Sequence, residues 1–175
     1  MHTSPLQRIL ALDLHPRSFA FAVFEGPWKL VDWGARSFRR GLNAVVVDEG
    51  RKLAHLLDRY VPRLILLQVR RARRVRRMLA VITNEAALRH IPVRALPPKA
   101  FRQAFPETSR SKYEIAATIA GRLPELRSIL PPRRKPWQSE RYPMCIFDAA
   151  AAGIAHFTPS HAPSHSPNLS NGPRG

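Results

Sequence analysis

Residues 8–26 constrain the fold of this chain more than any other stretch. They read RILALDLHPRSFAFAVFEG, two short apolar runs on either side of a polar turn that contains Pro16. Runs of this length around such a turn predict the two strands of a β-hairpin. The first run ends in Asp13, and a carboxylate among apolar residues is costly unless it is paired, protonated or bound to a metal. Asp13 therefore either accepts hydrogen bonds from the amides of the turn at 16–18 or belongs to a functional site.

The rest of the chain alternates between short apolar strands and amphipathic helices. Hydrophobic periodicity predicts, in order, a strand, a helix, a strand, a helix, a strand and two helices: Trp28–Phe38, Leu42–Tyr60, Arg63–Val69, Arg71–Arg89, Ile91–Leu96, Lys112–Arg122 and Met144–Phe157. This order predicts an α/β fold, a mixed five-stranded sheet made of a three-strand meander plus αβ crossovers, with helices on both faces. We expect one domain over 1–157 and a disordered tail rich in Pro, Ser and His over 158–175.

The charge of the chain indicates a polyanionic partner. A net charge of +17 over 175 residues is typical of proteins that bind nucleic acid, and less often of those that bind an anionic membrane. A proteome whose proteins are generally rich in arginine would give the same net charge, so charge alone does not establish binding. The single cysteine, Cys145, excludes a disulfide within the chain and fits the reducing cytoplasm. Neither a signal peptide nor a membrane-spanning run is expected.

Two of the twelve acids stand in apolar surroundings, Asp13 and Asp148. The other ten, Asp48 and Glu49 among them, are expected in turns, caps, polar helix faces or near helix ends. Asp148 lies in CIFDAAAAG, at the start of a helix that is apolar nearly all round. It could form a buried ion pair with an arginine. Alternatively, Asp13 and Asp148 meet at the sheet and hold a hard divalent cation through oxygen ligands.

Two basic segments are candidates for nucleic-acid contacts. The first is an arginine run at the start of the second helix, and it contains Arg70, Arg73, Arg74, Arg76 and Arg77. These charges repel one another, and a phosphate backbone would relieve the repulsion. The second segment is a proline-rich loop with Arg133, Arg134, Lys135 and Trp137. Its mixture of cations and rings suits stacking on unpaired nucleotides. A solvated helix face and an ordinary surface loop are the alternatives.

The order of these motifs resembles the RNase H-like superfamily, and its RuvC-type Holliday junction resolvases in particular. The resemblance rests on a first strand that ends in Asp13, on Lys112 in Ser-Arg-Ser-Lys, and on an Asp-Ala-x-Ala…His run that joins Asp148 to His156. It covers roughly residues 8–156. The resemblance implies a magnesium-dependent nuclease of DNA recombination and repair that cuts branched DNA, with Asp13, Gln68, Lys112, Asp148 and His156 in the catalytic site. It also implies a homodimer.

Two departures from that pattern weaken the implied metal site. The family's fourth strand ends in a metal-binding Glu, and this position is Gln68 here, or Leu67 one register back. The family's last helix offers two metal-side residues three apart, and the residue three before Asp148 is Cys145. We therefore expect Asp13 and Asp148 to hold one Mg²⁺ weakly, with Gln68 as a neutral oxygen ligand. The alternatives are a catalytically inactive protein of this fold that only binds DNA or RNA, and a basic factor associated with the ribosome or other RNA.

Overall fold

The computed structural model describes residues 7–38, 44–68, 72–97, 100–101, 104–105, 111–133 and 143–158, with backbone only at 44–47 and 72–74. Its strands are β1 (Ile9–His15), β2 (Ser18–Gly26), β3 (Lys29–Ser37), β4 (Leu64–Gln68) and β5 (Val93–Ala95). Its helices are α1 (Ala44–Tyr60), α2 (Ala72–Leu88), α4 (Lys112–Arg122) and α5 (Met144–Phe157), with a 3-10 turn η1 (Pro124–Ile129) that the sequence did not predict. Beyond Thr158, the predicted tail lies outside the described residues.

The five strands form one mixed sheet in the order β3-β2-β1-β4-β5. β1 and β2 pair antiparallel across the turn at 16–17, and β2 and β3 also pair antiparallel, which confirms the predicted hairpin and meander. β4 and β5 then join in parallel, each after a helical crossover. The central position of β1 explains its apolar sequence, because a strand with neighbours on both sides and helices on both faces is buried throughout.

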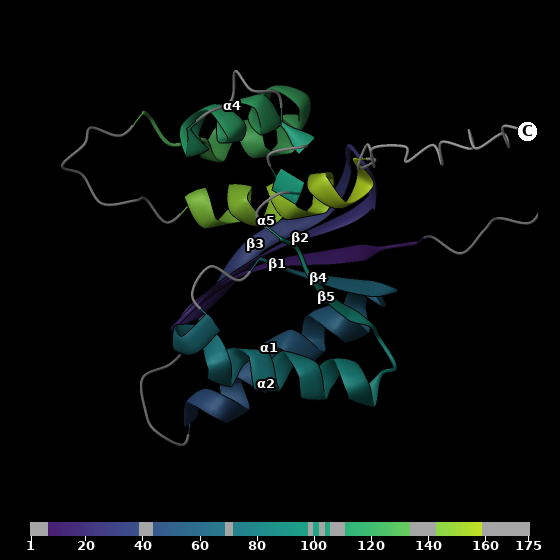
Figure 1. Cartoon of the computed structure of the whole chain (residues 1–175). Coiled ribbons are helices and arrows are strands. Elements are labelled where there is room, and N and C mark those ends of the chain that lie inside the picture. Colours follow the sequence, from purple (N-terminus) through teal and green to yellow (C-terminus); the bar gives the residue numbers. More distant parts are fainter. Residues whose placement is uncertain are drawn as a thin grey trace, which may run out of the picture.

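Helices cover both faces of the sheet, as the sequence predicted (Figure 1). Alternate residues of β1 serve the two layers: Leu10 and Leu12 pack toward α1 and α2, whereas Ile9 and Ala11 pack toward Ala152 of α5. Small residues along α5 let that helix lie close to the sheet. The closest approach is at Gly153, where an added Cβ would come within 2.4 Å of the Phe24 ring.

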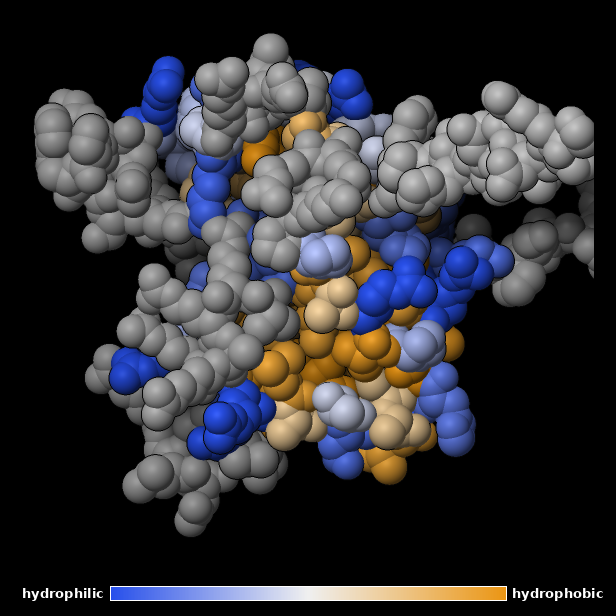
Figure 2. Space-filling view, in the orientation of Figure 1, coloured by the Kyte–Doolittle hydropathy of each residue, from blue (hydrophilic) through white to orange (hydrophobic). Residues whose placement is uncertain are grey.

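The edge strand β5 is more exposed than the sequence indicated, since all three of its residues are exposed. Two large apolar side chains near this edge, Leu88 and Val93, also reach the surface. Figure 2 shows hydrophobic residues gathered on this face, over the region where Figure 1 draws β5 and α2. None of the helices in the described ranges has the length and apolar character needed to cross a membrane.

Candidate active site

Asp13 lies at the centre of the sheet, near the carboxyl end of β1. Its Cα partners are Ala20 on β2 and Gln68 on β4. Because side chains alternate along a strand, Asp13 shares the α5 side of the sheet with Ile9 and Ala11. Its side chain is only 3% exposed. The sheet thus presents a buried carboxylate to the helix that carries Asp148.

Gln68 is the residue of β4 that faces this site. Leu64 and Leu66 pack on the α5 side, so Gln68 shares that face, directly beside Asp13. Leu67 pairs with Leu12 and packs with it on the opposite face, against α1 and α2. The alternative register, with Leu67 at the site, is therefore wrong.

The first turns of α5 bring Cys145 and Asp148 to the same place. Burial, together with the nearby carboxylates of Asp13 and Asp148, raises the pKa of the Cys145 thiol to about 12. Since both carboxylates act on one thiol, Asp13 and Asp148 both lie near Cys145. At neutral pH this thiol is protonated and adds no charge to the site.

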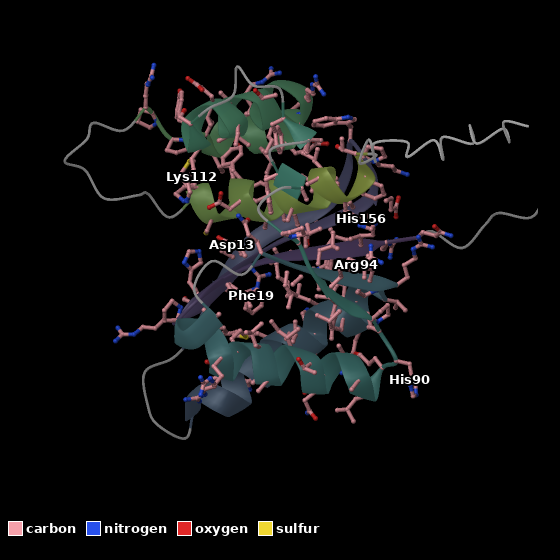
Figure 3. The ribbon with its side chains drawn as sticks, viewed as in Figure 1. Asp13, Phe19, His90, Arg94, Lys112 and His156 are labelled. Atoms are coloured by element: carbon pink, nitrogen blue, oxygen red, sulfur yellow. The ribbon has the colours of Figure 1, made fainter. Side chains whose placement is uncertain are left out.

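Each of the two carboxylates has a basic side chain beside it. Nε2 of His15 lies 2.9 Å from Oδ2 of Asp13, so this hydrogen bond, and not one from the turn amides, partners the buried acid among the described residues. Nζ of Lys112 donates to Oδ2 of Asp148 over 3.0 Å. Figure 3 shows Lys112 and Asp13 near the same end of α5. Lys112 reaches this point because the capping box of Ser111 and Glu114 begins α4 there.

The donor atoms at this place fit one hard divalent cation better than two. Asp13, Gln68 and Asp148 offer carboxylate and amide oxygens, the ligands that Mg²⁺ prefers. Two ions held 3.5–4 Å apart need several carboxylates between them, whereas Gln68 and the protonated Cys145 supply no charge. Within the described ranges, no three His, Cys, Asp or Glu side chains are arranged to hold a metal ion. The residues present therefore make a weaker site than the resemblance implies.

The structure does not bring His156 to this site. His156 lies in the last turn of α5, eight residues after Asp148, which corresponds to about 12 Å along a helix. Burial lowers the pKa of His156, and the positive charges of Arg94 and Arg63 lower it further. Figure 3 accordingly shows His156 with Arg94 at the end of α5 away from Lys112. His156 thus lies on the predicted helix, about two turns beyond Asp148, and the place in the catalytic site that the resemblance implies for it does not fit this geometry.

The arginine run is described only in part. Arg70 lies outside the described residues, and for Arg73 and Arg74 only the backbone is described. Arg76 and Arg77 are exposed, and Nε of Arg77 lies 3.6 Å from Oε2 of Glu49. In the loop, Arg133 is exposed, and Arg134, Lys135 and Trp137 lie outside the described ranges.

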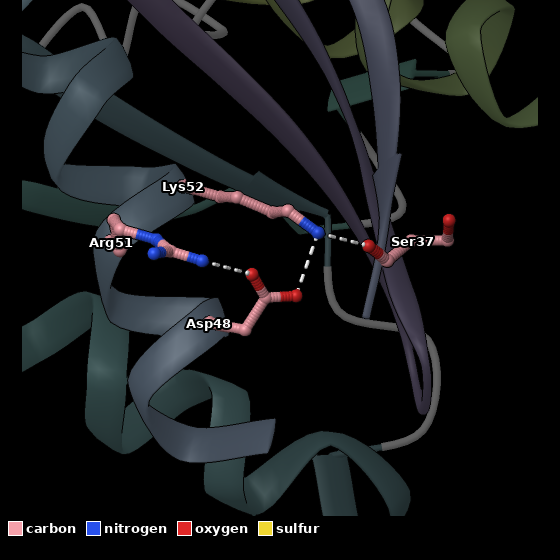
Figure 4. A network of polar contacts seen from close by, with 4 residues as sticks. All are labelled: Ser37, Asp48, Arg51 and Lys52. Atoms are coloured by element: carbon pink, nitrogen blue, oxygen red, sulfur yellow. Dashed lines mark hydrogen bonds and ion pairs between the residues drawn. The ribbon is translucent and has the colours of Figure 1, made fainter. Parts of the chain in front are cut away.

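Asp48 and Glu49 are buried in α1, so the prediction that they lie on a polar face or in a cap is wrong. Burial raises the pKa of Glu49, and its Oε2 has no hydrogen-bond partner among the described residues. Asp48 accepts hydrogen bonds from Arg51 and Lys52, and Lys52 also donates to the carbonyl oxygen of Ser37 on β3 (Figure 4). Glu49 thus contacts Arg77 of α2, and Lys52, which Asp48 holds, joins α1 to β3. The helical period alone does not show that neighbouring elements cover this side of α1.

Comparison with known proteins finds solved structures that have a similar fold. No protein-family model matches the sequence, and no curated protein matches it. Among solved structures, a complex of Thermus thermophilus RuvC with a Holliday junction substrate matches with a TM-score of 0.66 at 19% identity, over 87% of this chain and 93% of that one. Thermus thermophilus RuvC matches with a TM-score of 0.61 at 19% identity, over 85% and 92%. The yeast mitochondrial Holliday junction resolvase Ydc2 matches with a TM-score of 0.56 at 16% identity, over 88% and 81%.

Proposed function

The chain has a RuvC-like RNase H fold, and from this we propose that it binds branched DNA and hydrolyses it weakly with the help of Mg²⁺. One observation supports the proposal: Asp13, beside Gln68 on the α5 face of the sheet, and Asp148, distant in sequence, both lie near Cys145. A buried carboxylate with a second, half-buried one close by is costly to keep without a ligand or a counter-charge. Recombination or repair of DNA in the cytoplasm is the setting we propose for this activity.

Each residue has a defined part in the proposed hydrolysis. Asp13, Gln68 and Asp148 would hold one Mg²⁺, which when bound polarises a phosphate and activates water. Lys112 is a fixed positive charge beside Asp148, suited to stabilising negative charge on the phosphate. His156 has no part, since it lies at the other end of α5. The missing charge at Gln68 makes metal binding weak, so we propose slow turnover.

A second candidate is a protein of the same fold that only binds. Two contacts favour it: His15 lies 2.9 Å from Asp13, and Lys112 lies 3.0 Å from Asp148. Lys112 supplies positive charge where a metal would otherwise supply it, and His15 does so when it is protonated. In that case the site would engage a phosphate without cutting it.

Binding is tested first, because both candidates require it. Fluorescence anisotropy would compare a four-way DNA junction, a linear duplex of the same sequence and a structured RNA, each titrated with the protein in EDTA at several salt concentrations. We expect the junction to bind at least about tenfold more tightly than the duplex, a difference of about 1.4 kcal/mol. Equal affinity for junction and duplex would contradict the proposal, and tighter binding of RNA would favour the RNA-associated alternative.

Charge substitutions locate the contact surface. Arg76→Gln removes one exposed charge from the arginine run, and Arg127→Gln removes one from the surface of η1. If Arg76 contacts a phosphate, its substitution lowers the log–log salt slope by about one. Arg127→Gln is the matched control and should leave the slope unchanged. The proposed homodimer is tested in the same samples by sedimentation.

A further inference from the structure

Three cationic side chains gather at the end of α5 that lies away from Asp13. Arg63 directly precedes β4, Arg94 is the middle residue of β5, and His156 is in the last turn of α5. Arg94 is the Cα partner of Leu66, which packs beneath α5, so Arg94 lies on the α5 side of the sheet. Arg63 directly precedes Leu64, which packs with Ala152 and Phe157 near the end of α5, and the positive charges of Arg94 and Arg63 lower the pKa of His156. Figure 3 shows Arg94 and His156 at this end of the helix.

No acid balances this cluster in the described part of the chain. The ion pairs of the described acids are made elsewhere: Asp13 with His15, Glu25 with Arg8 and Lys29, Asp48 with Arg51 and Lys52, Glu49 with Arg77, Asp58 and Glu85 with Arg89, and Asp148 with Lys112. The carbonyl groups at the end of α5 offset the positive charge only in part. Two arginine charges and a histidine that can take up a proton therefore converge from three separate elements without a counter-ion among these residues.

The chemistry of the cluster suits a phosphate. Arginine forms paired hydrogen bonds with phosphate oxygens, and a protonated histidine adds a third donor. The cluster also lies in line with the candidate active site. From Asp148 to His156 the distance along α5 is about 12 Å, and from Asp13 to Ile9, the partner of Leu64, it is about 13 Å along β1. A nucleic-acid strand that lies along α5 would span both places.

We propose that Arg63, Arg94 and His156 form a phosphate-binding cluster that holds the nucleic-acid backbone about 12 Å from the candidate active site. This inference rests on the proposed function for the identity of the ligand, and on the cluster alone for the binding of phosphate. It assigns a role to His156 that the active site does not give it. An ordinary patch of surface cations is the alternative.

The first arm of the test needs no nucleic acid. NMR titration of the His156 ring would give its pKa in chloride and in inorganic phosphate at equal ionic strength. We expect phosphate to raise the pKa, because a bound anion favours the imidazolium. In Arg63→Gln/Arg94→Gln the phosphate response should disappear. Both arginines are exposed, so the double variant should fold, and thermal melting checks this. No response in the wild type would overturn the cluster.

The second arm uses the four-way junction. The double variant should lower the log–log salt slope of junction binding by about two, and Arg127→Gln, an exposed arginine on η1, should not change it. A phosphate response with an unchanged slope would mean a site for free phosphate only, and would overturn the nucleic-acid assignment. If the wild type binds no junction at all, the proposed function and the backbone role both fail, and the NMR arm alone decides whether the cluster binds phosphate.

Discussion

Gly153 is the residue whose side chain is most tightly restricted by packing. An added Cβ would lie 2.4 Å from the ring of Phe24, which is fully buried and cannot move aside. Gly153→Ala should therefore destabilise the protein by about 1–3 kcal/mol. Gly121 of α4 is the matched control, since nothing lies within 4 Å of its added Cβ. Gly121→Ala should stabilise by about 0.5–1 kcal/mol through helix propensity. Urea denaturation measures both, and equal effects would contradict this packing.

The thiol of Cys145 reports whether the two carboxylates meet. With a pKa of about 12, the rate of alkylation by iodoacetamide should still be rising at high pH, because the thiolate is the reactive form. Asp13→Asn removes one of the charges that raise this pKa, so the rate profile should shift to lower pH. Asp58→Asn, on the exposed face of α1, is the control.

A steric effect on alkylation can be told apart from an electrostatic one. Burial slows the reaction at every pH, whereas a changed pKa moves the profile along the pH axis. A wild-type midpoint near the ordinary value of 9 would contradict the burial of the thiol. A midpoint that Asp13→Asn leaves in place would mean that Asp13 is not beside Cys145.

At the level of elements, α1 is joined to β3 through Lys52. Its Nζ donates to the carboxylate of Asp48 over 2.7 Å and to the carbonyl oxygen of Ser37 over 2.6 Å (Figure 4). Lys52→Met keeps the apolar stem and loses both hydrogen bonds, so it should destabilise by about 1–3 kcal/mol. Arg51 contacts the same carboxylate but is 73% exposed, and Arg51→Met should cost less than about 0.5 kcal/mol. Similar losses in the two variants would show that Lys52 does not join the elements.

The elements themselves could be predicted from sequence, because period and capping are local properties. α4 and α5 both have their predicted bounds. Burial that depends on a neighbouring element could not be predicted. Glu49 is buried because α2 packs beside it. From the sequence of α1 alone, its position looks exposed to solvent.

At the scale of the whole molecule, the sheet register decides which residues share the site. Sequence alone left Gln68 and Leu67 as alternatives, and only the pairing of β1 with β4 selects Gln68. Asp13 and Asp148 could be selected as candidates because each stands in an apolar run. The distance of His156 from the site follows from its motif, because eight residues along α5 put it about 12 Å beyond Asp148. The resemblance nevertheless assigned it to the site.

Cleavage of a four-way DNA junction in Mg²⁺ by wild type, Gln68→Glu and Asp13→Asn tests the central claim most directly. Gln68→Glu is nearly isosteric and adds a carboxylate beside Asp13, so it should raise both metal affinity, measured by calorimetry, and the cleavage rate. Wild type should cleave slowly and Asp13→Asn not at all. Cleavage that persists in Asp13→Asn, or a folded Gln68→Glu that gains neither metal affinity nor cleavage, would contradict the account.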